Sequence, residues 1–192
     1  KIKLTNKICY VYGCGLNGFN YRKKISINAG NSGTFARLIL GLLVHSPYEV
    51  KLIGDKSLSR RDFLRIITPL KEFGANFKKL NNNGLPLKIF GSEFIKPINY
   101  FERRGSAQCK SSVILAALST PGKTIIKAKK SRDHTELFLK YLRLPIKIKR
   151  KNKYDLIEIN GQVQFKSFDY FVPGDASSSA FFIVLTLLLK NS

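Results

Sequence analysis

A junction between small residues and a long apolar run occurs three times in this chain, at intervals of about 70 residues. The three copies occupy residues 28–43, 105–118 and 174–189. Each apolar run is long enough for a buried helix, and the small residues before it are typical of a helix start. Ser32 or Thr34 is a suitable N-cap for the first helix. Such a start directs free backbone N–H groups and the positive end of the helix dipole at one point, where an anion can bind.

The segments that follow the first two junctions also correspond to each other. Each contains a short strand, a polar turn with arginine, a second helix and two further strands. The expected elements are 50–53, 57–61, 63–73, 76–80 and 85–90 in the first copy, and 124–128, 131–134, 135–142, 146–149 and 156–159 in the second. The sequence therefore predicts an α/β fold built from a repeated unit of helix, strand, helix, strand and strand.

Residues 1–18 precede the first junction and contain an alternating apolar run that ends in a glycine-rich turn at 13–18. This pattern predicts a β-hairpin. Gly13 and Gly15 form only a fragment of a dinucleotide-binding fingerprint, and no amphipathic helix follows them. The pattern thus favours a hairpin over a dinucleotide-binding fold.

The formal net charge of +22 comes from 34 basic and 12 acidic residues. An excess of this size favours an anionic partner, which is either a nucleic acid or a small anionic substrate. The lysines are spread over all the predicted strands and turns, and no helix-turn-helix, zinc-binding or RNP-type motif accompanies them. We therefore expect a small anionic substrate, with a basic nucleic-acid-binding module as the alternative.

Cysteine usage and hydropathy favour a cytoplasmic protein. Cys9, Cys14 and Cys109 are unevenly spaced and form no CxxC motif, which favours a reducing compartment over a disulfide framework. No apolar run reaches the roughly 18 residues that a membrane-spanning helix needs, and no secretory pattern begins the chain. Because methionine is absent even at position 1, we expect an internal piece of a longer protein.

Candidate anion-binding side chains lie at the helix starts and in the arginine-bearing turns. Two adjacent arginines before a helix, Arg60 and Arg61, can grip a phosphate or carboxylate in bidentate fashion, and the alternative is a solvated turn. At the second helix start, Ser106 is either a ligand contact or a plain N-cap. The other candidates are Asn31, Gly33, Thr34, Arg37, Gln108, Lys110, Ser131 and Arg132.

The turn at 131–136 also carries acidic residues and a histidine. Asp133 at an N-cap and Glu136 three residues later fit a capping box, so these acids are expected to be structural. His134 and His45 have no partner at ligand spacing, so we expect no metal site. No nucleophile elbow accompanies a Ser/His/Asp set.

Five motifs in order resemble the middle of the 5-enolpyruvylshikimate-3-phosphate synthase family. They are NAGNSGT at 28–34, GDKSLSRRDF at 54–63, RGSAQCKSS at 104–112, SRDHTE at 131–136 and VPGDASSSAFF at 172–182. Members of that family are more than twice as long as this chain, so the resemblance implies about half of such an enzyme.

The resemblance implies a fold and a domain organisation. Family members have two similar domains, each made of three βαβαββ units in an inside-out barrel with helices packed inside and sheets outside. Residues 1–170 would then form a partial substrate-binding domain, with the tail of unit one and all of units two and three. Residues 171–192 would form the crossover into the second domain.

The resemblance also implies an activity, the transfer of an enolpyruvyl group from phosphoenolpyruvate to shikimate 3-phosphate with release of phosphate. The family needs no metal or organic cofactor and is expected to act as a cytoplasmic monomer. Its acid–base residues lie in parts absent from this chain, so we expect no catalytic residue here, and weak binding without turnover. Motif positions imply phosphoenolpyruvate contacts from Asn31, Gly33, Thr34, Arg61 and Gln108, and shikimate 3-phosphate contacts from Ser106, Ala107, Gln108, Ser131 and Arg132.

Two positions depart from the family pattern, since Leu38 and Asp62 replace prolines that are common there. Asp62 places a carboxylate beside Arg61, and we expect this to weaken the grip of Arg61 on an anion. A related family, the UDP-N-acetylglucosamine enolpyruvyl transferases, shares the fold and the donor and is the alternative. That family has a catalytic cysteine in the loop before the corresponding arginine, whereas this loop reads Gly54-Asp55-Lys56.

Overall fold

Two successive units of the same topology make up most of the molecule. The computed structural model describes residues 1–15, 24–164 and 166–189. The first unit consists of β3 (Ile25–Asn28), α1 (Gly33–Leu42), a 3₁₀ turn (Leu43–His45), β4 (Val50–Ile53), α2 (Lys56–Ser59), α3 (Leu64–Glu72), β5 (Asn76–Lys79) and β6 (Leu87–Phe90). Its sheet has the order β3-β4-β6-β5, with β3 and β4 parallel and the other pairs antiparallel.

The second unit repeats this arrangement. It consists of β7 (Asn99–Glu102), α4 (Ala107–Ser119), β8 (Lys123–Lys129), α5 (His134–Tyr141), β9 (Ile146–Arg150) and β10 (Tyr154–Asn160). Its sheet has the equivalent order β7-β8-β10-β9, again with only the first pair parallel. Each unit is therefore βαβαββ, as the family resemblance implied.

The residue patterns gave the helices and the later strands correctly but missed the first strand of each unit. β3 and β7 are only four residues long, and each pairs in parallel with the strand after the next helix. Four residues contain too few alternations to be recognised without that partner. The predicted turn at 57–61 also differs, because residues 56–59 form α2, whose start is capped by Asp55 through its Oδ1 and the N–H of Leu58 at 2.7 Å.

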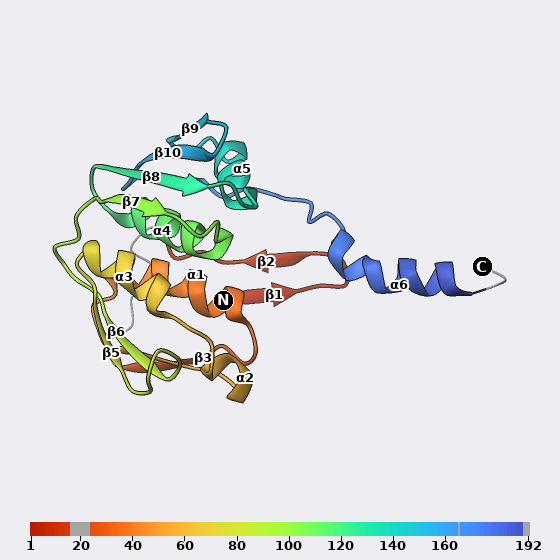
Figure 1. The fold of residues 1–192 in the computed structure, drawn as a ribbon, viewed down its shortest axis with the longest axis horizontal. Helices are drawn as coiled ribbons and strands as arrows, with labels where there is room; N and C mark the ends of the chain where they lie inside the picture. The colour runs from red at the N-terminus through yellow and green to blue at the C-terminus, as the bar shows by residue number, and fades with distance from the viewer. Residues whose placement is uncertain (16–23, 165, 190–192) are drawn as a thin grey trace.

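Helices α1, α3 and α4 lie between the two four-stranded sheets (Figure 1). The strands alternate in burial, as in β10, where Asp155, Ile157 and Ile159 face inward. α4 is the central helix and is buried along most of its length from Cys109 to Ala117. Helices inside and sheets outside agree with the predicted fold class, although the described residues form no closed barrel.

The contact between α1 and α4 is close enough to exclude a side chain at Gly41. A Cβ atom there would overlap the carbonyl oxygen of Ser112. The Ser112 hydroxyl, fully buried, donates a hydrogen bond to the carbonyl oxygen of Arg37 at 2.9 Å. These contacts fix the two helices side by side, so that their starts open on the same region.

Both ends of the described chain are exposed. The hairpin predicted near the N-terminus is confirmed as β1 (Ile2–Leu4) with β2 (Cys9–Val11), but its turn lies at residues 5–8. The predicted glycine-rich turn is not the hairpin turn, and its residues 16–18 lie outside the described part. α6 (Ala176–Leu188) extends away from the sheets with no buried residue (Figure 1). In the described part of the chain, no helix is both long enough and apolar enough to span a membrane.

Candidate functional site

The starts of α1 and α4 meet and form the centre of the candidate site. Ser32 caps α1 by accepting from the N–H of Phe35 at 3.1 Å, and Ser106 caps α4 by accepting from the N–H of Cys109 at 3.3 Å. Ser32 is thus the N-cap, not Thr34, and Ser106 caps α4, while a ligand contact by Ser106 stays a prediction. The first turn of each helix presents its positive dipole end to the same region.

A buried carboxylate shapes the turn before α4. Glu102, at the end of β7, accepts hydrogen bonds from the backbone N–H groups of Arg104, Gly105 and Ser106 at 3.1, 2.6 and 2.9 Å. It is 3% exposed. The sequence analysis missed this role, because a single Glu at a strand end carries no distinguishing pattern.

A chain of hydrogen bonds links Arg37, Gln108 and Thr34 across the two helices. Arg37 Nη1 donates to Gln108 Oε1 at 2.7 Å, and Gln108 Nε2 donates to Thr34 Oγ1 at 2.7 Å. An arginine can only donate, so the carbonyl oxygen of the amide must face Arg37. Thr34 Oγ1 is the acceptor in this pair, so its own hydrogen and the second hydrogen of the Gln108 NH₂ group are left to donate to an anionic ligand.

Arg37 and Arg61 approach each other over Gly33. The Nη1 atoms of both arginines lie 3.0 Å from the position that a Cβ on Gly33 would take, so glycine lets them lie here without a shift. Burial, followed by the nearby charges of Arg65 and Arg61, lowers the pKa of Arg37. In the described part of the chain none of these three arginines forms an ion pair with a carboxylate. The region therefore holds several arginines with no carboxylate of the described residues in direct contact with them.

The two adjacent arginines of the turn point to different places. Arg60 lines a second depression, together with Lys56, Asp62 and the Asn81–Gly84 segment, whereas Arg61 reaches Gly33. A joint grip by the pair, expected from their adjacency, is therefore wrong. Asp62 accepts from the N–H of Leu64 at 2.8 Å and makes no ion pair with Arg61, so its effect on the grip of Arg61 stays a prediction.

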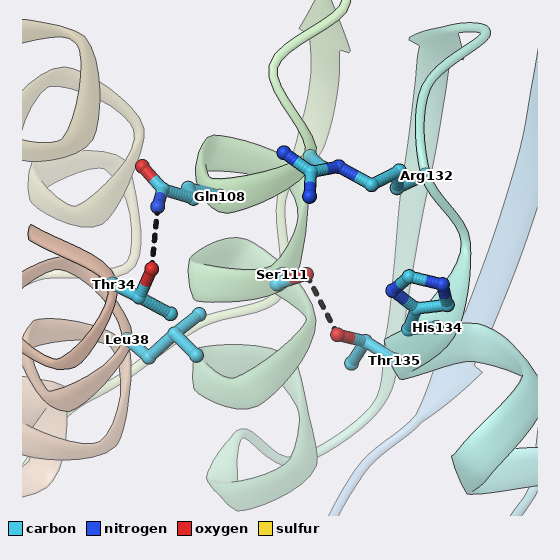
Figure 2. Close-up of a pocket in the computed structure, with 8 residues that line it drawn as sticks. Thr34, Leu38, Gln108, Ser111, Arg132, His134 and Thr135 are labelled. Carbon is cyan, nitrogen blue, oxygen red and sulfur yellow. Dashed lines mark hydrogen bonds between the residues drawn. The ribbon is translucent and has the colours of Figure 1, made fainter. Parts of the chain in front are cut away.

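A pocket of about 260 Å³ lies between the start of α4, α1 and the turn before α5. Figure 2 shows Thr34 and Leu38 on one side, Arg132 and His134 on the other, and Gln108 and Ser111 of α4 between them. Ala107 and Thr135 complete the lining. Hydroxyl, amide and guanidinium groups thus surround an open space with apolar contacts at Leu38 and Ala107, which suits a small polyhydroxylated anion.

The turn before α5 differs from the predicted capping box. Asp133 does occupy the N-cap position, but its side chain makes no capping bond and instead accepts from Arg150 Nη2 at 2.5 Å. This bond lowers the pKa of Asp133. Glu136 turns away to Lys110. The start of α5 is therefore left without a side-chain cap beside Arg132, and Ser131 Oγ is buried there without a hydrogen-bond partner.

The structure brings some of the predicted site residues together and separates others. Thr34, Ala107, Gln108 and Arg132 line the pocket, and Gly33 and Arg61 adjoin it over α1. Asn31 instead donates to Asp55 Oδ2 at 2.5 Å, which helps lower the pKa of Asp55 after the bond from the N–H of Leu58. Across the described residues, no three His, Cys, Asp or Glu side chains converge as metal ligands.

The residue patterns overlooked Ser111, His134 and Thr135 as lining residues. A signal for Ser111 exists in the repeat, because it stands 74 positions after Arg37, the offset that also relates Thr34 to Gln108. Equivalent helix positions in repeated units face the same region. His134 and Thr135 have no such signal, since their exposure to the pocket depends on how α5 packs.

Comparison with known proteins identifies the family. The family model described as EPSP synthase (3-phosphoshikimate 1-carboxyvinyltransferase) matches residues 1–191. The chain belongs to the EPSP synthase family. Relatives named 3-phosphoshikimate 1-carboxyvinyltransferase include those of Caldicellulosiruptor bescii, 43% identical over 194 residues, and Streptococcus agalactiae serotype III, 40% identical over 193 residues. Each alignment covers 100% of this chain and 44% of the relative.

Solved structures of EPSP synthases have the same fold. An EPSP synthase from Acinetobacter baumannii superimposes with a TM-score of 0.83 at 32% identity, covering 96% of this chain and 41% of that one. The chain thus spans less than half the length of the relatives that it matches. The resemblance drawn from the five motifs is confirmed, which favours an EPSP synthase over a UDP-N-acetylglucosamine enolpyruvyl transferase.

Proposed function

We propose that this chain supplies one wall of the active site of a 3-phosphoshikimate 1-carboxyvinyltransferase, the name of its relatives. The observation that carries the proposal is the convergence of Arg37 and Arg61 over Gly33 without a paired carboxylate, next to the donors of Gln108 and Thr34. Substrates that together carry several negative charges would bind there, held by preorganised positive groups.

The two substrates would occupy adjacent parts of this wall. Phosphoenolpyruvate would lie over Gly33 and Thr34, gripped by Arg61 and touched by the Gln108 amide. Asn31 would contact phosphoenolpyruvate from the edge of this region. Shikimate 3-phosphate would lie in the pocket against Ala107 and Gln108, with Ser106 at its rim.

The phosphate of shikimate 3-phosphate would lie at the start of α5, near Arg132 and Ser131. Support comes from the missing side-chain cap of α5 and from the unpaired Ser131 hydroxyl, because free N–H groups at a helix start favour a phosphate. An anion there would accept hydrogen bonds from the backbone N–H groups at the start of α5, which the side chain of Asp133 does not cap.

The reaction would be an addition followed by an elimination. The hydroxyl of shikimate 3-phosphate gives its proton to a base, and its oxygen bonds to the central carbon of phosphoenolpyruvate while the methylene carbon takes a proton and becomes a methyl group. Loss of a proton from this methyl group and of phosphate from the central carbon then leaves the enolpyruvyl ether. Arg61 and Gln108 would stabilise the charge of the tetrahedral intermediate and orient the substrates. The groups that move the protons would come from the remainder of the enzyme.

We also propose that residues 171–192 lead into a second domain, while 1–170 belong to the first. Support comes from α6, whose exposed residues include Phe181, Phe182, Leu187 and Leu188, each more than 70% exposed. An apolar helix of this kind is stable in water only when another surface covers it. Turnover would accordingly require the whole enzyme, and measurable phosphate release by the 192-residue chain alone would contradict this.

The two neighbouring arginines provide a test of the proposed function. In the full-length enzyme, Arg61→Ala should lower kcat/KM for phosphate release at least 100-fold, about 2.7 kcal/mol of lost transition-state stabilisation. Arg60→Ala is the matched control, since it removes the same charge one position away and should change kcat/KM less than about threefold. Equal losses in both variants, or no turnover by the unchanged enzyme, would contradict the proposal.

A further inference from the structure

A buried ion pair lies behind the pocket and has no part in the reaction proposed above. Lys110 of α4 and Glu136 of α5 have side chains only 1% and 2% exposed, and Lys110 Nζ is 2.6 Å from Glu136 Oε1. Removing two charges from water costs several kcal/mol for each ion, which their attraction offsets only in good geometry. A pair this deeply buried therefore needs an explanation.

The pair connects the two elements that form opposite walls of the pocket. Lys110 lies in α4 between the lining residues Gln108 and Ser111, and Glu136 directly follows the lining residue Thr135. Beside the ion pair, Ser111 Oγ and Thr135 Oγ1 are 2.7 Å apart (Figure 2). Two successive residues of α4 thus contact two successive residues of the first turn of α5.

Little else fixes the first turn of α5 against α4. Of the eight residues of α5, only Glu136 and Leu139 are buried, and the ring contacts of Phe138 and Tyr141 with Phe168 and Tyr170 anchor the later part of the helix rather than its first turn. Asp133 caps no backbone group and is turned toward Arg150 of β9, which also binds the buried Asp155. The orientation of this turn toward α4 therefore depends on polar contacts, of which the Lys110–Glu136 pair is the most deeply buried.

The pair is also not arranged for maximal stability. Lys110 Nζ and Glu136 Oε2 are both buried without a hydrogen-bond partner, so attraction between the charges rather than an aligned hydrogen bond joins the two side chains. Apolar residues of similar volume commonly replace such pairs with no loss of stability, but they do not join one point of α4 to one point of α5. Such a junction holds the neighbouring Arg132 and His134 in place, and binding groups displaced by about 1 Å lose much of their effect.

We propose that Lys110 and Glu136 are positioning residues that hold the 131–135 turn in place, so that Arg132 and the start of α5 face Gln108 across the pocket. The inference rests on the proposed function and deepens it. The ion pair acts on the side of the site assigned to shikimate 3-phosphate. Loss of the ion pair should consequently weaken the binding of shikimate 3-phosphate more than the binding of phosphoenolpyruvate.

A paired apolar replacement separates positioning from stability. Either single variant leaves one charge buried and unpaired, so Lys110→Met and Glu136→Leu are combined in one full-length enzyme. We expect a urea unfolding midpoint at or above that of the unchanged enzyme. The KM for shikimate 3-phosphate should rise at least about tenfold, and the KM for phosphoenolpyruvate should change much less.

The control makes the same chemical change at an exposed pair. Lys123 and Glu158 lie 4.0 Å apart on the outer face of the second sheet, and Lys123→Met with Glu158→Leu should leave both KM values unchanged. A stable double variant at 110 and 136 with unchanged KM values would overturn the positioning role and leave the proposed function intact. Absence of turnover in the unchanged enzyme would instead overturn the proposed function, and this inference with it.

Discussion

At the scale of single residues, the geometry of the site depends on Arg37, whose guanidinium group can donate hydrogen bonds but cannot accept them. Arg37 is 4% exposed, and its donation to Gln108 Oε1 fixes the amide so that Nε2 faces Thr34. The ring of Phe63, 5.4 Å from the Arg37 guanidinium carbon, supports the arginine from below by a cation–π contact. A buried arginine thus sets the polarity of a side chain that borders the pocket.

Replacing the amide by a carboxylate tests this polarity. Gln108→Glu keeps the acceptor that faces Arg37 but removes the Nε2 donor and adds negative charge beside the pocket. We expect the KM for phosphoenolpyruvate to rise at least about tenfold, with little change in the urea unfolding midpoint. Gln164→Glu makes the same charge change at an exposed position and should leave the KM as it is. An unchanged KM in Gln108→Glu would show that the donor is not used.

At the scale of secondary-structure elements, the site exists because α1 and α4 start side by side. The overlap that a Cβ on Gly41 would make with the Ser112 carbonyl shows how closely the two backbones approach. This contact brings Thr34 and Gln108, 74 positions apart, within hydrogen-bond distance. The spacing of the helices, rather than any single side chain, thereby sets the width of the site.

A methyl group at the crossing should therefore be destabilising. Gly41→Ala places it against a backbone oxygen that cannot rotate away, so the helices must separate. We expect a loss of about 3 kcal/mol in the free energy of unfolding, measured by urea denaturation of the chain. Gly13→Ala, where nothing lies within 4 Å, should stay within about 0.5 kcal/mol. Equal stability of the two variants would contradict the close crossing.

At the scale of the whole molecule, two βαβαββ units pack against each other through their helices and form a compact centre, and α6 lies outside it (Figure 1). The largest buried side chains, among them Phe63, Phe73 and Leu70, belong to this centre. A helix of 13 residues without buried side chains has only its own hydrogen bonds to hold it. Stability is consequently distributed very unevenly along the chain.

Hydrogen exchange measures this difference directly. In the 192-residue chain, amides of α6 should exchange near the rate of an unstructured peptide, whereas those of α4 should exchange slowest. In the full-length enzyme, a covering domain should slow exchange in α6 by at least about 100-fold. Exchange in α6 that is equally fast in both would contradict the assignment of residues 171–192 to a crossover.

The sequence by itself determined the local elements and the family. Alternation in residues such as Thr124–Ala128 and the caps at Ser32 and Ser106 are encoded within a few positions, so the patterns located them. The repeat and its five motifs likewise depend only on order along the chain. The residue patterns did not predict the four-residue strands β3 and β7, because the strand that pairs with each of them lies beyond the next helix.

Tertiary structure alone decided which side chains meet. Adjacency in sequence suggested that Arg60 and Arg61 act together, but packing of the turn places Arg60 at the second depression and Arg61 beside Gly33. Spacing suggested that Glu136 caps its own helix, but burial beside Lys110 offers this carboxylate a charged partner. The pairing of Arg37 with Gln108 likewise joins residues 71 positions apart. Such contacts depend on how helices and sheets pack across the core, and no local pattern contains that information.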